Sequence, residues 1–137
     1  MLFEAMIAVL IFSMGVLALV ALQATSIKLS ADAKYRAVAA MMTDQLFSEM
    51  WVSGSSASAL QTDFQSPDGT KYSAWKARVA KAFDKPADFD FAGSPPEVVV
   101  SGNPAIVTIV LQWPDKNSTS EALRKHTARA QIVATAQ

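Results

Sequence analysis

Residues 1–22 form an almost uninterrupted apolar stretch, and no other feature of the chain restricts its fold as strongly. The stretch carries one charge, Glu4, and its only other interruptions are Ser13 and Gly15. A helix of about 22 residues rises roughly 33 Å, which is enough to cross the hydrocarbon core of a bilayer. We therefore expect a helix that can span a membrane.

Three properties argue against a cleaved signal peptide. No Lys or Arg precedes the apolar run, and the run is longer than the roughly 7–15 apolar residues of a typical signal peptide. It also lacks a small-x-small cleavage site at its end. Glu4 has two interpretations at this point: a solvated carboxylate at the headgroup level, or a carboxylate that pairs with a cation of another chain. Gly15 likewise marks either a close helix–helix approach or a locally weak segment.

The helix is expected to continue past the apolar stretch to about residue 52. From Gln23 onward, apolar residues recur at intervals of three or four, which predicts one buried helical face. No proline occurs before Pro67, and the first strong stop signal is the segment 53–56. The predicted buried positions of this second half are Ile27, Ala31, Tyr35, Val38, Met42, Leu46 and Met50.

The rest of the chain predicts a small α+β domain. Residues 53–70 are expected to form a connecting loop that can hold a helical turn at 57–64, and apolar spacing predicts a short helix over 72–83. Alternating patterns predict antiparallel strands at 98–100, 105–113 and 125–135. A sheet of about three strands cannot bury its apolar face alone, so we expect it to pack on the second half of the long helix.

Composition and motifs exclude several classes of function. The 137 residues include 12 basic and 12 acidic ones, without the basic stripe of a nucleic-acid-binding protein, so no nucleic-acid partner is expected. There is no cysteine, and the catalytic motifs of hydrolases and phosphate-binding loops are absent. His126, the only histidine, is expected to be exposed. The acidic loop of Asp84, Asp88 and Asp90 lacks the order of an EF-hand. We expect no enzyme activity, no metal and no cofactor.

The N-terminal stretch resembles a known family. Residues 2–12, Leu-Phe-Glu-Ala-Met-Ile-Ala-Val-Leu-Ile-Phe, are similar to the mature N-terminus of type IV pilins and pseudopilins. Residues 15–19 and 22–24, the Trp-Lys-Ala-Arg-Val of 75–79 and the Leu-Gln-Trp of 111–113 resemble the PilV-type minor pilins. Three residues precede Glu4 where family members usually have four, and the helix-kinking proline of many major pilins is absent.

The resemblance implies a pilin-like fold and an assembly role. Residues 1–25 would be the transmembrane and filament-core half of the helix, and residues 26–137 the globular pilin domain, which includes the helix over 26–52. Glu4 would pair with the N-terminal amine of a neighbouring subunit. The side chains that would face lipid first and other subunits later are Leu2, Phe3, Ile7, Leu10, Ile11, Phe12, Val16, Leu17, Leu19 and Leu22.

The resemblance also implies location and partners. A basic leader removed by prepilin peptidase would leave a single-pass protein in the bacterial inner membrane with a periplasmic C-terminal domain, later part of an extracellular pilus. Its partners would be inner-membrane lipid, other minor and major pilins, and an adhesin at the pilus tip. A minor pilin of a type IV pilus is the leading hypothesis. Its alternatives are a minor pseudopilin of a type II secretion system, an ordinary single-pass anchor that carries a binding domain, and a membrane-bound enzyme.

Overall fold

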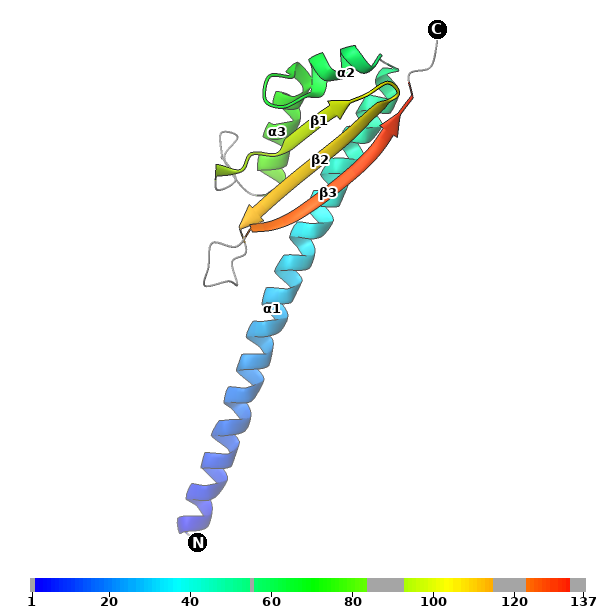
Figure 1. The fold of residues 1–137 in the computed structure, drawn as a ribbon. Helices are drawn as coiled ribbons and strands as arrows, with labels where there is room; N and C mark the ends of the chain where they lie inside the picture. The colour runs from blue at the N-terminus through cyan, green and yellow to red at the C-terminus, as the bar shows by residue number, and fades with distance from the viewer. Residues whose placement is uncertain (1, 55, 84–92, 115–122, 134–137) are drawn as a thin grey trace. The chain divides into compact units, whose positions relative to one another are not determined.

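The computed structural model describes residues 2–54, 56–83, 93–114 and 123–133. Within these ranges, three helices precede three strands (Figure 1). The helices and strands are α1 (Leu2–Ser53), α2 (Ala57–Phe64), α3 (Thr70–Ala82), β1 (Glu97–Ser101), β2 (Ala105–Pro114) and β3 (Leu123–Ile132). The contacts divide the chain into two compact units, Met1–Lys34 and Tyr35–Gln137, and α1 contributes to both. The expected α+β fold with one long N-terminal helix is confirmed.

The three strands form one antiparallel sheet in the order β1-β2-β3. Val100 pairs with Val107, and Val107 pairs in turn with Ala130. The turn between β1 and β2 contains Gly102, whose φ of +78° lies in the region that glycine adopts without strain. β3 begins at Leu123, two residues before the expected start, and ends at Ile132. The last part of the strand predicted to reach residue 135 lies outside the described residues.

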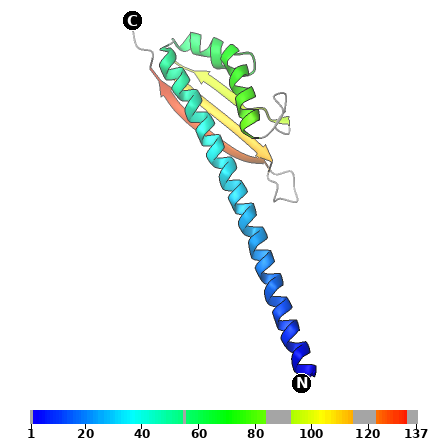
Figure 2. The ribbon, with the colours of Figure 1, turned by 180° about the vertical axis from the view of Figure 1, so that it is seen from behind.

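The core of the second unit lies between one face of the sheet and the helices. Figures 1 and 2, which show the two sides of the sheet, place residues 35–53 of α1 and helix α3 on the same face. The inward positions of β2 are those that the alternation predicted, and they are buried. The core comprises Ala39, Met42, Leu46, Met50, Leu60, Phe64, Tyr72, Trp75, Val79, Ala80, Phe83, Val98, Val100, Ala105, Val107, Ile109, Leu111, Trp113 and Ile132.

The buried face of α1 is shorter than its apolar periodicity suggested. Met42, Leu46 and Met50 are buried as expected. Ile27 and Ala31 continue the same spacing, but both are exposed. The reason is that both belong to the first unit, whereas every core residue lies at or beyond Ala39.

Two short helices, rather than the single extra helix expected, connect α1 to the sheet. The segment expected to hold only a helical turn is the eight-residue helix α2, and the Oγ of its N-cap Ser56 accepts a hydrogen bond from the Ala59 amide at 3.4 Å. A close turn then leads to α3. A Cβ added to Gly69 would lie 2.6 Å from the Asp63 carbonyl oxygen, so this turn needs glycine.

Polar contacts fix α3 against its neighbours. The Trp75 indole Nε1 donates a hydrogen bond to the Met42 carbonyl oxygen of α1 at 3.0 Å. Arg78 forms a two-point ion pair with Glu49, with N–O distances of 2.6 and 2.8 Å. The hydrogen bonding of the Arg78 guanidinium to the Glu49 carboxylate is the main reason that the pKa of Arg78 is raised. These contacts join α3 to the second part of α1 directly rather than through the sheet.

The buried hydroxyl of Tyr72 leads us to expect a loss of stability at high pH. Its hydroxyl donates a hydrogen bond to the Pro96 carbonyl oxygen at 2.5 Å, and burial, followed by the nearby charge of Glu97, raises its pKa. The folded-state pKa therefore lies above that of the unfolded chain. The resulting stabilisation is complete below about pH 10 and is lost as the pH rises through the raised folded-state pKa.

We expect the free energy of unfolding to fall more steeply above about pH 10 in the unmodified protein than in a Tyr72→Phe variant. The variant should also be less stable by about 1 kcal/mol at neutral pH, because its side chain no longer bonds to Pro96. Urea unfolding of both proteins over this pH range measures the two effects. Parallel pH profiles would contradict the assigned role of Tyr72.

Candidate functional site

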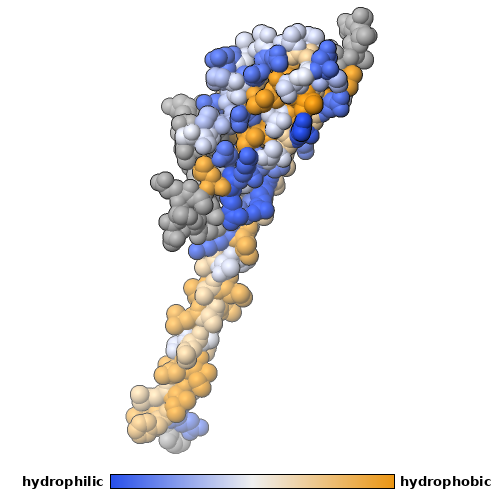
Figure 3. Space-filling model, viewed as in Figure 1, coloured by the Kyte–Doolittle hydropathy of each residue, from blue (hydrophilic) through white to orange (hydrophobic). Residues whose placement is uncertain are grey.

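The first unit exposes apolar side chains on a scale that soluble monomers avoid. Every described residue from Leu2 to Leu22 is exposed, and the surface of this part of α1 is hydrophobic along its length (Figure 3). Contiguous apolar patches of this kind mark surfaces that contact lipid or other proteins. By length and composition α1 can cross a membrane, and none of its most apolar window is buried.

The apolar residues singled out by the sequence lie around the whole circumference of α1. At about 100° per residue, Leu10 and Leu22 point in directions roughly 120° apart, and Phe12 fills the remaining sector. A helix that is apolar all round needs an apolar environment on every side. The predicted set is exposed throughout and consists of Leu2, Phe3, Ile7, Leu10, Ile11, Phe12, Val16, Leu17, Leu19 and Leu22.

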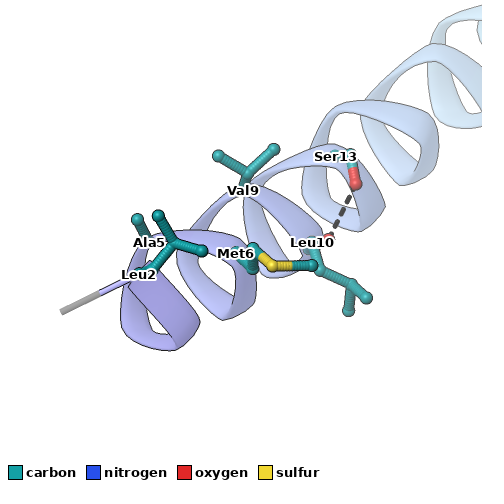
Figure 4. Close-up of a pocket in the computed structure, with 6 residues that line it drawn as sticks. All are labelled: Leu2, Ala5, Met6, Val9, Leu10 and Ser13. Atoms are coloured by element: carbon teal, nitrogen blue, oxygen red, sulfur yellow. Dashed lines mark hydrogen bonds between the residues drawn. The ribbon is translucent and has the colours of Figure 1, made fainter.

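One side of this helix carries a shallow apolar groove. Its lining residues follow helical spacing along one face and are Leu2, Ala5, Met6, Val9, Leu10 and Ser13 (Figure 4). The only hydroxyl in the groove is satisfied within the helix, because Ser13 Oγ donates to the Leu10 carbonyl oxygen at 2.8 Å. Ser13 would therefore add little cost if this face were placed in lipid or in a helix interface.

Glu4 lies away from the groove. At about 100° per residue it is on roughly the opposite side of α1 from the groove's centre. It occupies the first turn, where the positive end of the helix dipole favours a carboxylate. Within the described residues Glu4 is exposed and has no ion pair. The structure thus presents Glu4 as the one charged group on an apolar surface, open to a partner outside the described chain.

Gly15 lies within the helix and has open space around its Cα. A Cβ added there would meet no atom within 4 Å, and its backbone does not require glycine. Within the described chain, Gly15 is therefore not needed for folding, since alanine fits the same position and is the better helix former by roughly 1 kcal/mol. Both interpretations of Gly15, a close helix approach and a weak segment, remain predictions about its behaviour with partners.

His126 is not exposed as the sequence suggested. It is half-buried, because strand alternation turns the even-numbered residues of β3 toward α1. Its Nε2 lies 3.3 Å from Oγ1 of the buried Thr43. That hydroxyl also lies 2.8 Å from the Ala40 carbonyl oxygen, so it donates there and accepts from the imidazole N–H. This contact could not be predicted from the position of His126 near the start of a predicted strand, because it depends on where the sheet lies on the second part of α1.

No cluster of three or more His, Asp or Glu side chains that could hold a metal occurs in the described ranges. Asp84, Asp88 and Asp90 lie outside them. A small hollow beside β1 is lined by both prolines and polar side chains, and the hydroxyl of Tyr72, its one phenol, donates to the Pro96 carbonyl oxygen. The candidate site taken forward is the exposed apolar helix with Glu4.

Comparison with known proteins returned no match: no family model, no curated protein and no solved structure is significantly similar to this chain. The function of the chain must therefore be inferred from its own residues and from the N-terminal resemblance. The geometry adds two facts to that resemblance. The apolar part is fully exposed, and the same helix supplies the core of the second unit.

Proposed function

We propose that this protein is a minor pilin that initiates assembly of a type IV pilus or is incorporated into it. One observation carries the proposal. A single helix, α1, is exposed from Leu2 to Leu22 and apolar there except for Glu4 and Ser13. The same helix contributes Ala39, Met42, Leu46 and Met50 to the core of the α+β unit. A soluble domain has no use for such an extension, whereas a subunit that is stored in lipid and then polymerised needs it.

The physical basis of assembly is an exchange of surroundings. In the inner membrane the apolar half of α1 contacts lipid, and in a filament it contacts the same surface of other subunits. Because lipid tails and apolar side chains are similarly hydrophobic, the burial free energy changes little in this exchange. Packing and specific polar contacts then decide the register between subunits. Glu4 is the only charged side chain available for this among the first 22 residues.

The pairing of Glu4 supplies that specificity. A carboxylate in an apolar filament core is costly unless a cation compensates it, and the N-terminal amine of a neighbouring subunit is the partner that the resemblance implies. The globular unit would then lie in the periplasm before assembly and at the filament surface afterwards. Its partners in this proposal are other minor and major pilins, prepilin peptidase during maturation, and an adhesin at the pilus tip.

The test compares Glu4→Gln with Glu4→Asp in cells that make the filament. We expect Glu4→Gln to reduce the protein recovered in sheared filaments roughly tenfold or more, since a hydrogen bond to a charged group contributes about 1.5–3 kcal/mol. Glu4→Asp keeps the charge and should retain most of the incorporation. Both variants should remain in the membrane fraction.

Three outcomes separate the alternatives. Normal incorporation of Glu4→Gln would overturn the proposal in favour of an ordinary membrane anchor. Loss of protein export with intact pili would place the chain in a type II secretion system instead. Loss of the variant from the membrane would show that Glu4 acts in insertion rather than in subunit pairing, and would also overturn the assigned role.

A further inference from the structure

One edge of the sheet is closed by side chains. On β1, the Val98 carbonyl oxygen accepts hydrogen bonds from the Ser66 amide and hydroxyl, both at 3.0 Å, and the Val98 amide donates to Ser66 Oγ at 3.1 Å. Gln61 Nε2 donates to the Val100 carbonyl oxygen at 3.0 Å. The segment α2 and the loop after it therefore occupy the outer edge of β1, so this edge cannot accept another strand.

The opposite edge, β3, has no further strand beside it in the part of the chain that the structure describes. β3 pairs with β2 from Leu123 to Ile132 in unbroken register, without a bulge, and it contains neither Gly nor Pro. In an antiparallel pair, every second residue turns its N–H and C=O groups away from the partner strand. Among the described residues, the ladder bonds of β3 run to β2 alone, because β3 is the last strand in the sheet order. Figure 1 shows β3 along the free side of the sheet.

The exposed side chains of β3 give this edge a positive charge. Lys125 and Arg129 are exposed on the face that points away from α1, with Thr127 between them. Neither β2 nor β3 contains an acidic residue. The two cations are four residues apart. If a strand were added beside β3, two of its side chains, with the same spacing and on the same face of the sheet, would lie opposite these cations.

This charge pattern discriminates between occupants. If two copies paired antiparallel about Thr127, Lys125 of each would stand opposite Arg129 of the other. Like charges placed directly opposite destabilise strand pairing, so a second copy is disfavoured in this register. Opposite charges in the same positions stabilise it. The edge is therefore complementary to a strand that carries two carboxylates at the same spacing.

We propose that the outer edge of β3 is a docking site for an extended, acidic segment of another protein, which adds as a fourth strand with Asp or Glu opposite Lys125 and Arg129. The backbone of β3 supplies the hydrogen bonds, and the two cations select the acidic partner over a second copy of this chain. This site is separate from the apolar helix and does not depend on the filament proposal.

The test uses the full chain in detergent micelles and labelled peptides of about nine alternating threonines and valines. One peptide carries two glutamates four residues apart, and a matched peptide carries lysines there. We expect the acidic peptide to bind roughly tenfold more tightly than the basic one in fluorescence anisotropy. Lys125→Glu combined with Arg129→Glu should reverse this preference. The matched control, Lys76→Glu with Lys81→Glu on α3, changes the net charge equally and should leave it unchanged.

Hydrogen exchange of the unsubstituted protein gives a readout that is independent of the variants. Binding of the acidic peptide should protect alternate amides of β3 and none of β1. Four results would overturn the proposal. Two concern the peptides and variants: neither peptide binds, as expected if the cations only prevent edge aggregation, or the α3 control variant loses the preference equally. The other two are undiminished binding of an acidic peptide whose backbone is N-methylated, and protection of β3 by self-association without peptide.

Discussion

Replacing Trp75 with alanine should lower the free energy of unfolding of the globular unit by about 3–5 kcal/mol. The Trp75 side chain is 0% exposed, and it is the largest of the fully buried side chains. Its indole also donates a buried hydrogen bond to the Met42 carbonyl oxygen, which links α3 to α1. The substitution removes the packing of the ring, leaves a cavity between the two helices and breaks that link. Urea unfolding followed by far-UV circular dichroism measures the loss.

Two controls separate these contributions. Trp75→Phe keeps most of the ring volume but cannot donate to Met42, so it should be milder than Trp75→Ala, although the smaller ring still leaves some space. Trp51→Ala removes the same residue type from a position that is 52% exposed, and its effect should stay within about 0.5 kcal/mol. Equal losses for Trp51→Ala and Trp75→Ala would contradict the assigned core.

Replacing Leu17 with arginine should raise the apparent free energy of membrane insertion by about 3–4 kcal/mol. On insertion scales an arginine near the centre of a span costs about 2.5–3.5 kcal/mol, and the favourable contribution of leucine is lost as well. Leu17 is 69% exposed and does not belong to the core of the described chain, so its substitution should leave the packing of that core unchanged. A glycosylation-reporter insertion assay or alkaline extraction of membranes measures the effect.

Ile27→Arg is the matched control for this experiment. Ile27 is 70% exposed, nearly the same as Leu17, so the two positions are equivalent if burial within the chain alone decides the outcome. They differ in the proposed function, because Ile27 follows the predicted membrane segment of residues 1–25. We expect Ile27→Arg to insert normally. Equal effects at the two positions would show that the membrane boundary lies elsewhere.

Sequence periodicity predicted the elements that are long and strongly patterned. The 52-residue helix α1 follows from an apolar run, a helical stripe and the absence of proline before Pro67. The alternation of Val107, Ile109 and Leu111 gave the inward face of β2 correctly. The apolar contact surface with Glu4 could also be found from the sequence, because a charge within such a run stands out in any single chain.

Features that depend on contacts distant in sequence could not be predicted. Ile27 continues the helical stripe, but where burial begins on α1 depends on how far the sheet reaches. The contact between His126 and Thr43 joins residues 83 positions apart. Ser66 lies in an unremarkable polar loop, and only its position beside Val98 shows that it completes the bonding of β1. None of these side chains carries a local pattern of its own.

The Ser66 contact also limits how many chains the sheet can recruit. Because the β1 side is blocked, a strand can join the described part of the sheet only beside β3. The added strand would have a free outer margin of its own. Each copy of the chain would hold one added segment, in a one-to-one stoichiometry, and copies could not link their sheets into a continuous array because each has a single free margin. A chain whose sheet had two free margins could link copy to copy, as fibres do.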